Sequence, residues 1–207
     1  MLDIAPLPEG LNTVCRLGVV ADTHIPDRVR SLHPDLLPGL KAANVEAILH
    51  AGDICSTAVI KELEQVAPVV AVRGNRDWAF AGTLPWARSF TTGGIRIAMQ
   101  HGMGNFWHYW LDKLKYATVG YHFVRYKRLL LRSMPGHDVM IFGHTHHAVN
   151  LAEDGILFFN PGSAAVTPVT WPAPSFGVLT LDGQWGVTGE IISMRRIPVQ
   201  AGNWVIE

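Results

Sequence analysis

The stretch Ile141-Phe142-Gly143-His144-Thr145-His146-His147 decides how the rest of this sequence is interpreted. The apolar residues from Val139 to Phe142 predict a buried strand, and Gly143 lets the backbone turn sharply as it leaves the sheet. In an extended chain, residues i and i+2 project to the same side, so His144 and His146 can converge on one polar site. This spacing suits a metal site, although on this stretch alone the two residues could equally be a pair of surface histidines.

The length and composition of the chain set the broad class. With 207 residues the chain is long enough for one domain with a full core, which we place over 1–207. A hydrophobic share of 48%, a charged share of 16% and zero formal net charge indicate a compact globule and favour neither a nucleic-acid nor a membrane partner. Cys15 and Cys55 form no disulfide framework and fit a reducing compartment. The first ten residues do not read as a signal peptide, so we expect a cytoplasmic protein.

The first half of the chain alternates apolar strands with helices. Apolar runs at 17–21, 46–50 and 68–72 predict core strands. Helices are expected between them, over 34–44 and over 56–66. This order is the sequence form of a parallel α/β sheet.

The second half of the chain changes to hairpins with glycine-containing turns. Their strands are expected within 90–100, at 148–151 and 156–159, and at 176–181 and 185–194. Parallel units followed by hairpins predict an α/β fold with four layers, an αββα sandwich of two mixed β-sheets flanked by helices.

Seven polar residues of metal-binding type follow these apolar strands. Open α/β folds bind ligands outside the carboxyl ends of their strands, so the seven side chains are expected to meet at one edge. They are Asp22, His24, Asp53, Asn75, His101, His144 and His146. Nitrogen and oxygen donors without thiolate favour Mn²⁺, Fe, Zn²⁺ or Ni²⁺ over a structural cysteine-rich zinc site. His50, just before this series continues at Asp53, is expected to support a ligand or to be a satisfied core histidine.

The seven residues stand in ordered motifs. These are Asp22-x-His24, Gly52-Asp53, Gly74-Asn75, His101-Gly102 and Gly143-His144-x-His146. Their order resembles that of the calcineurin-like metallophosphoesterases. The spacing, the chain length and the Asn160-Pro161-Gly162-Ser163 turn are similar to the small prokaryotic cytosolic phosphodiesterase subgroup, and the resemblance covers 17–194.

The resemblance implies a hydrolase with two divalent metal ions, for which Mn²⁺ is the first choice. The first ion would be held by Asp22, His24, Asp53 and His146. The second ion would be held by Asp53, Asn75, His101 and His144. Two such ions can activate a bridging hydroxide and clamp the oxygens of a small or nucleotide-like phosphate ester. The residues expected to serve catalysis are Asp53, Asn75, Arg76 and His101.

Arg76 departs from the family pattern, in which a histidine or, in the subgroup, a cysteine often follows the ligand asparagine. A guanidinium does not release its proton at physiological pH, so Arg76 cannot be a general acid. Arg76 could bind phosphate through two N–H groups, or it could form a salt bridge to Asp77 or to a neighbouring loop. Efficient expulsion of a poor alkoxide leaving group is therefore in doubt.

An insertion rich in aromatic and basic residues, at about 105–134, is a second departure from the family. On a helix that begins near Tyr121, one face would carry Phe123, Tyr126 and Leu130. The opposite face would carry Arg125, Arg128 and Arg132. The segment is either an ordinary amphipathic helix or a cap beside the metal site. As a cap it would contact an anionic substrate, an acidic partner or a second subunit, which makes a homo-oligomer through 105–134 one prediction.

Two other classes of function remain open at this stage. The chain could be a non-catalytic metal-binding scaffold or interaction module of the same fold, as a retromer subunit of the family is, or it could be a nuclease. A scaffold does not need all seven ligands, and a neutral chain without a second domain is unfavourable for polymeric nucleic acid. We therefore expect an enzyme acting on a small phosphate ester, with no membrane partner.

Overall fold

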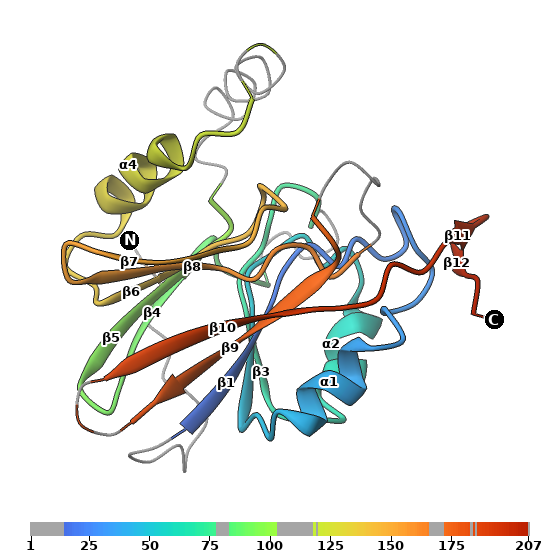
Figure 1. The fold of residues 1–207 in the computed structure, drawn as a ribbon, viewed down its shortest axis with the longest axis horizontal. Coiled ribbons are helices and arrows are strands. Elements are labelled where there is room, and N and C mark those ends of the chain that lie inside the picture. Colours follow the sequence, from blue (N-terminus) through green and yellow to red (C-terminus); the bar gives the residue numbers. More distant parts are fainter. Residues whose placement is uncertain are drawn as a thin grey trace.

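Two five-stranded sheets pack face to face in this computed structural model, which describes residues 15–77, 83–102, 118, 120–165, 172–182, 184 and 186–206 (Figure 1). The first sheet contains, in spatial order, β10 (Val187–Ser193), β9 (Ser175–Leu181), β1 (Cys15–Val20), β2 (Ala47–His50) and β3 (Val69–Ala71). The second contains β4 (Ala87–Thr92), β5 (Ile95–Gln100), β6 (Val139–Ile141), β8 (Ile156–Asn160) and β7 (Val149–Glu153). Both sheets are mixed, because antiparallel strands flank a parallel centre in the second and lie along one edge of the first.

Helices α1 (Leu36–Ala42) and α2 (Thr57–Leu63) make the crossovers between the parallel strands β1, β2 and β3. Ser56 caps α2, since its Oγ accepts the backbone N–H of Ala58 at 3.2 Å. Figure 1 shows both helices on the outer face of the first sheet. The predicted strands and helices of the first half are therefore confirmed, with bounds shifted by a few residues.

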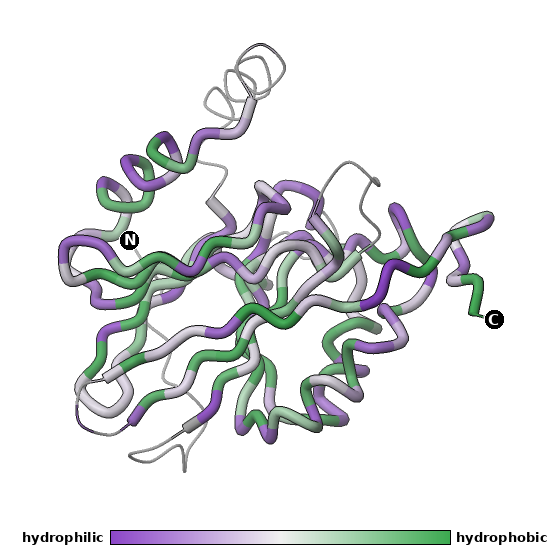
Figure 2. The backbone as a smooth tube through the Cα atoms, in the orientation of Figure 1, coloured by the Kyte–Doolittle hydropathy of each residue, from purple (hydrophilic) through white to green (hydrophobic). Residues whose placement is uncertain are grey.

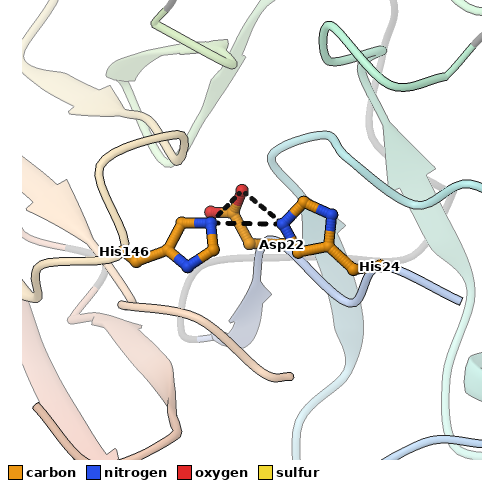
Figure 3. Close-up of side chains that lie close together, drawn as sticks. All are labelled: Asp22, His24 and His146. Atoms are coloured by element: carbon orange, nitrogen blue, oxygen red, sulfur yellow. Dashed lines mark hydrogen bonds and ion pairs between the residues drawn. The ribbon is translucent and has the colours of Figure 1, made fainter. Parts of the chain in front are cut away.

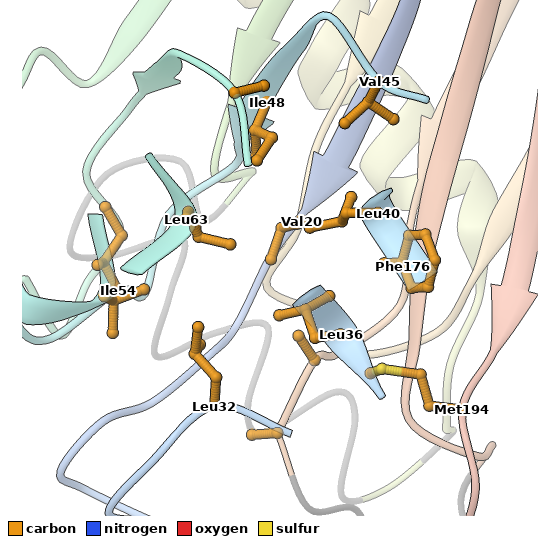
Figure 4. Close-up of a cluster of buried hydrophobic side chains, with 14 of the residues drawn as sticks. Val20, Leu32, Leu36, Leu40, Val45, Ile48, Ile54, Leu63, Phe176 and Met194 are labelled. Carbon is orange, nitrogen blue, oxygen red and sulfur yellow. The ribbon is translucent and has the colours of Figure 1, made fainter. Parts of the chain in front are cut away.

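The alternation of side chains along β1 explains the layers. Leu17 and Val19 point into the core between the two sheets, whereas Val20 points into the core beneath α1 and α2. Figure 4 shows this second core, where Leu36 and Leu40 of α1 lie close to Val20. In Figure 2 the apolar segments correspondingly follow the strands and the inner sides of the helices.

Helix α4 (Phe123–Ser133) supplies the fourth layer, on the outer face of the second sheet (Figure 1). Tyr126 and Leu130 are buried there against three residues of β6, β8 and the turn after β6. Those residues are Met140, Phe142 and Phe158. The αββα sandwich predicted from the sequence is thus confirmed, and so is the apolar face of this helix.

The predicted basic face of α4 needs one correction. Arg128 and Arg132 are exposed as expected, but Arg125 is half-buried and its Nη2 donates to the Gly120 carbonyl at 2.7 Å. The chain just before the helix passes close enough to capture this guanidinium, which a helical projection does not show. Residues 103–117 and 119 lie outside the described residues, so the cap predicted over 105–134 stays a prediction.

A short hairpin of β11 (Val199–Gln200) and β12 (Asn203–Trp204) near the carboxyl end was not predicted. Trp204 Nε1 donates to the Ser31 carbonyl at 3.0 Å, and the Trp204 ring lies edge-on to His33 with centroids 4.7 Å apart. The hairpin therefore holds the loop that follows β1. Within the described part of the chain, no helix has the length and apolar character that crossing a bilayer requires.

Candidate metal centre

The carboxyl ends of β1, β2, β3, β5 and β6 bring the predicted polar residues to one region. Because parallel strands run in the same direction, the loops that follow them leave at the same edge of each sheet. The Asp22 backbone N–H donates to the Gly52 carbonyl at 3.0 Å, and the Gly143 N–H donates to the His101 carbonyl at 3.1 Å. These bonds join neighbouring loops within each sheet, and the side chains described next join the two sheets.

The first group of side chains consists of Asp22, His24 and His146 (Figure 3). Asp22 Oδ1 lies 3.3 Å from His146 Nε2 and 3.6 Å from His24 Nε2. The two imidazole nitrogens are 3.1 Å apart, and all three side chains are buried. A divalent first-row ion binds such ligands at about 2.0–2.2 Å, so ligand atoms spaced in this way can surround one cation.

Asp53 connects this group to a second one. Its Oδ2 lies 3.9 Å from His24 Nδ1, and its Oδ1 lies 3.4 Å from His101 Nε2. His101 Nε2 is also 4.0 Å from Asp22 Oδ1, and the ring of His144 lies 5.2 Å from that of His101, centroid to centroid. Asp53 thus lies between His24 and His101, and Asp22 belongs to both three-residue clusters that could hold a cation, Asp22–His24–His146 and Asp22–Asp53–His101.

Four buried side-chain atoms of this region have no hydrogen-bond partner among the described residues. They are Asp22 Oδ1, His24 Nδ1, Asn75 Oδ1 and His101 Nε2. A buried polar group left unsatisfied costs about 1–3 kcal/mol, so four in one place indicate a missing common partner. Carboxylate, amide oxygen and imidazole donors suit first-row divalent cations. The donor set therefore fits a metal centre.

Backbone groups fix which atoms face this centre. The Ala51 carbonyl accepts a hydrogen bond from His101 Nδ1 at 2.8 Å, which leaves Nε2 facing Asp53. The His144 backbone N–H donates to Asp22 Oδ2 at 3.0 Å, which leaves Oδ1 for the centre. Each side chain thus uses one polar atom for support and keeps the other for a ligand.

The carboxylates and histidines of the centre shift one another's pKa values. Burial lowers the pKa of His24 to about 4, so this imidazole is neutral at pH 7. Burial also opposes the charged form of His101, but the carboxylates of Asp53 and Asp22 prevail and raise its pKa to about 10. Burial acts to raise the pKa of Asp53, and the His101 charge outweighs it and lowers the pKa to about 2. A cation held by His101 would therefore replace a proton.

The loops that carry these side chains have an uncommon backbone conformation. Asp22, His24, Asp53, His144 and His146 all have positive φ angles, between 49° and 69°. Non-glycine residues rarely enter this left-handed region, and each costs of order 1–3 kcal/mol unless surrounding contacts impose it. Such strain clusters at functional sites, so its presence at five candidate ligands supports a site that is built rather than incidental.

Asp77 ties two of the loops together, a role that was not predicted. Its buried carboxylate accepts the backbone N–H groups of Gly74 at 2.6 Å, Cys55 at 2.7 Å and Asp53 at 2.9 Å. Gly74 is required at this crossing because a Cβ there would overlap Asp53 Oδ1. The sequence around Asp77 gives no signal for this contact, since it depends on the approach of two loops.

Arg76 contributes both backbone and side chain at the same place. Its N–H donates to Asp53 Oδ1 at 2.9 Å, and its exposed guanidinium pairs with Asp27 at 2.8 Å. Of the salt bridges considered from the sequence, the structure shows the one to a neighbouring loop. Cys55 Sγ also lies near Asp27, at 3.9 Å, and burial raises the pKa of this thiol well above its ordinary range.

The turn of residues 160–163 supports the histidine loop from the side of the second sheet. Asn160 Nδ2 donates to the Gly143 carbonyl at 3.0 Å and to Thr145 Oγ1 at 3.1 Å. Ser163 Oγ donates to the Asp22 carbonyl at 3.1 Å. In the sequence this turn was noted only through the family resemblance. In the structure it contacts both the loop of Asp22 and the loop that carries His144 and His146.

His50 and the stacked rings of Tyr121 and His147 lie next to the candidate ligands in the sequence or the structure. His50 is buried and satisfied, because its Nδ1 accepts the Gly52 N–H at 3.2 Å and its Nε2 lies 3.3 Å from Thr23 Oγ1. Burial lowers the pKa of His50 to about 3. Tyr121 stacks on His147 with ring centroids 4.3 Å apart, so the described end of the insertion reaches the residue after His146.

The family model of the calcineurin-like phosphoesterase superfamily domain matches residues 15–184. This chain belongs to the calcineurin-like phosphoesterase superfamily. Over 168 residues, this chain is 35% identical to a probable metallophosphoesterase of Methanothermobacter thermautotrophicus, covering 81% of this chain and 87% of that one. Over 155 residues it is 30% identical to a phosphodiesterase of Methanocaldococcus jannaschii, covering 71% of this chain and 82% of the relative.

The fold of this chain is also similar to that of vacuolar protein sorting 29 from Entamoeba histolytica, solved in complex with Zn²⁺. The TM-score is 0.61 at 24% identity, covering 86% of this chain and 98% of the other. The family resemblance found in the sequence is confirmed, and the structure contains buried Asp and His groups that could hold a metal ion.

Proposed function

We propose that this protein is a dinuclear metal-dependent phosphodiesterase that hydrolyses small or nucleotide-like phosphate esters. The observation that carries the proposal is the presence of four unpartnered buried polar atoms in three strand-end loops, those after β1, β3 and β5. Membership of the superfamily and the similarity to an archaeal phosphodiesterase support it. A scaffold that binds no metal would have no reason to keep these atoms unsatisfied, because leaving them so is costly.

The residues proposed to hold the two ions follow the geometry of the two groups. Asp22, His24 and His146 would serve the first ion, and His101, His144 and Asn75 would serve the second. Asp53 would serve both, since its two oxygens face His24 and His101. We propose Mn²⁺ as the native metal because no thiolate belongs to either group, with Fe, Zn²⁺ and Ni²⁺ as alternatives.

When bound, two divalent cations lower the pKa of water and polarise phosphoryl oxygens. The chain's own groups supply orientation. Ala51 fixes His101, His144 fixes Asp22, and the Arg76 backbone holds Asp53 Oδ1. We propose that the exposed guanidinium of Arg76 contacts the substrate on the leaving-group side, because it is anchored next to the proposed bridging carboxylate. A cytoplasmic location and self-association through 105–134 stay predictions.

The proposal is tested by removing and restoring the metal. Chelator-treated protein, shown metal-free by elemental analysis, should not hydrolyse bis(4-nitrophenyl) phosphate, and Mn²⁺ should restore the activity. Asp53→Asn should lose more activity than His24→Ala, because Asp53 is proposed to hold both ions and His24 only one. His137→Ala is the matched control, since His137 pairs with Ser89 at 2.6 Å outside both groups. Full turnover by metal-free protein would refute the two-metal reading.

A protein that binds two equivalents of Mn²⁺ but hydrolyses neither mono- nor diesters would instead support a metal-binding scaffold. The phosphodiester and phosphomonoester panels should therefore be run on the same metal-loaded preparation. Two bound equivalents of Mn²⁺ together with hydrolysis on either panel would indicate an enzyme. Two bound equivalents without hydrolysis would indicate a scaffold, and neither outcome assumes a natural substrate.

A further inference from the structure

The guanidinium of Arg28 lies beside the first group and has no part in the proposal above. Arg28 Nη1 is 3.4 Å from His146 Nδ1, and the side chain is partly buried. The Arg28 backbone N–H donates to the His24 carbonyl at 2.9 Å. A tight turn directly after Asp22 and His24 therefore positions the Arg28 side chain. Arg28 and His24 thus belong to the same loop, and the turn between them fixes the position of Arg28.

Arg28 differs from the other arginines of this region in its partners. Arg76 pairs with Asp27 at 2.8 Å, whereas no carboxylate of the described residues lies within ion-pair distance of the Arg28 guanidinium. Burial and the nearby Arg76 charge lower the pKa of Arg28, while Asp22 and Asp53 act in the opposite direction. A guanidinium nevertheless keeps its proton in proteins. A partly buried cation without a carboxylate partner is uncommon and indicates an anionic ligand.

The contact with His146 does not satisfy this cation when a metal is bound. A guanidinium only donates, so a hydrogen bond at 3.4 Å requires His146 Nδ1 to be the acceptor. If His146 Nε2 holds a cation, the neutral ring carries its proton on Nδ1 and cannot accept. Among the described residues, the Arg28 guanidinium would then have no side-chain acceptor for its donors next to the first group.

The loop that presents Arg28 is held in place. Its Arg30 N–H donates to the Gly202 carbonyl at 2.8 Å, and Trp204 Nε1 donates to the Ser31 carbonyl at 3.0 Å. Both partners belong to the carboxyl-terminal hairpin, which lies beyond the part matched by the family model. A charged side chain on a loop supported in this way loses little freedom when it binds a ligand.

We propose that Arg28 is a phosphate-binding residue, whose guanidinium donates to non-bridging oxygens of a phosphate group at the metal centre. Planar guanidinium groups match the geometry of phosphate oxygens through paired N–H donors, which suits this task better than an ammonium. Arg28 binds the phosphate from the side of His146, and Arg76 lies on the side of Asp53. The inference rests on the proposed function, since it deepens the description of the same site.

The test uses inorganic phosphate as the probe and the Mn²⁺-loaded protein. Isothermal titration calorimetry should give a phosphate Kd about 10- to 100-fold weaker in Arg28→Ala than in the wild type, the effect of losing charge-assisted hydrogen bonds. Arg28→Lys should recover only part of this loss, because it restores the charge without the planar fork. Arg30→Ala removes an equal charge two residues away and should leave the Kd unchanged, since Arg30 is exposed.

Metal content and hydrolysis are measured on the same samples. A Kd in Arg28→Ala within twofold of the wild type, at equal metal content, overturns the inference while leaving the proposed function intact. Loss of metal from both Arg28 variants also overturns it, because Arg28 would then support the metal centre instead. If the wild type hydrolyses no ester yet binds phosphate through Arg28, the proposed function fails and the phosphate site stands.

Discussion

Replacing Asp77 with asparagine should weaken the metal centre without changing any proposed ligand. The Asp77 carboxylate is 1% exposed, and its Oδ2 accepts the N–H groups of Asp53 and Gly74 while Oδ1 accepts that of Cys55. An amide keeps one acceptor and turns the other into a donor. The best orientation keeps the two bonds to Oδ2 and leaves the Cys55 N–H facing an NH₂ group.

One buried donor without an acceptor costs about 1–3 kcal/mol. Burial raises the pKa of Asp77, and the hydrogen bonds from Gly74 and Cys55 offset only part of that shift, so the asparagine also removes an unfavourable charge. We therefore expect the free energy of unfolding to fall by about 1–2 kcal/mol, the lower part of that range. The affinity for Mn²⁺ should fall as well, because Asp53 and Asn75 lie in the two loops that Asp77 joins.

Urea denaturation of the metal-free proteins measures the first effect, and calorimetric titration with Mn²⁺ measures the second. Asp182→Asn is the matched control, because Asp182 Oδ1 also accepts two backbone N–H groups, from Gln184 and Gly186, each at 2.8 Å. Asp182 is exposed, so water can replace those bonds and the change should be within about 0.5 kcal/mol. Equal destabilisation in both variants, or unaltered Mn²⁺ affinity in Asp77→Asn, would refute the reasoning.

Three further predictions concern other parts of the molecule. The wild type should hydrolyse aryl phosphodiesters faster than alkyl ones, and Arg76→His should flatten the dependence of rate on leaving-group pKa, since imidazole can donate a proton; an unchanged slope would place Arg76 off the proton path. With its pKa raised to about 10, His101 should stabilise the metal-free protein fully below about pH 6.5 and lose that contribution as the pH rises toward 10. Urea denaturation at several pH values measures this change, and His101→Gln should abolish it. Leu130→Ala should cost about 2–5 kcal/mol in the same assay because Leu130 is fully buried beneath α4, whereas Val124→Ala, at a position 56% exposed, should cost little.

The fold could be predicted from the sequence because each element obeys a local rule. Alternate side chains of the apolar strand β1 enter the two cores on its opposite faces, and the Gly93-Gly94 pair marks the turn between β4 and β5. The candidate ligands were predictable for a related reason, since parallel strands deliver their carboxyl ends to one edge. The carboxyl-terminal hairpin was missed because two-residue strands have no periodicity to detect.

The supporting residues could not be predicted because their roles arise from contacts between distant segments. Asp77 meets Asp53 across 24 positions, and Arg28 meets His146 across 118. Arg125 was assigned to the open face of its helix, yet the Gly120 carbonyl captures it, and Gly120 lies outside the helix that the projection described. A residue type and its spacing therefore indicate a ligand, but they do not indicate what holds that ligand in position.

These supports explain how an unfavourable site persists in a stable fold. Five left-handed residues and four unsatisfied buried atoms each cost of order 1 kcal/mol or more, and they are concentrated in loops rather than in the sheets. The cores on both sides of the first sheet fix the strand ends that carry Asp22 and Asp53. Asp77 and Asn160 then hold the loops through buried hydrogen bonds. The strain is therefore imposed by the scaffold, and the atoms it leaves unsatisfied belong to the residues that we propose as metal ligands.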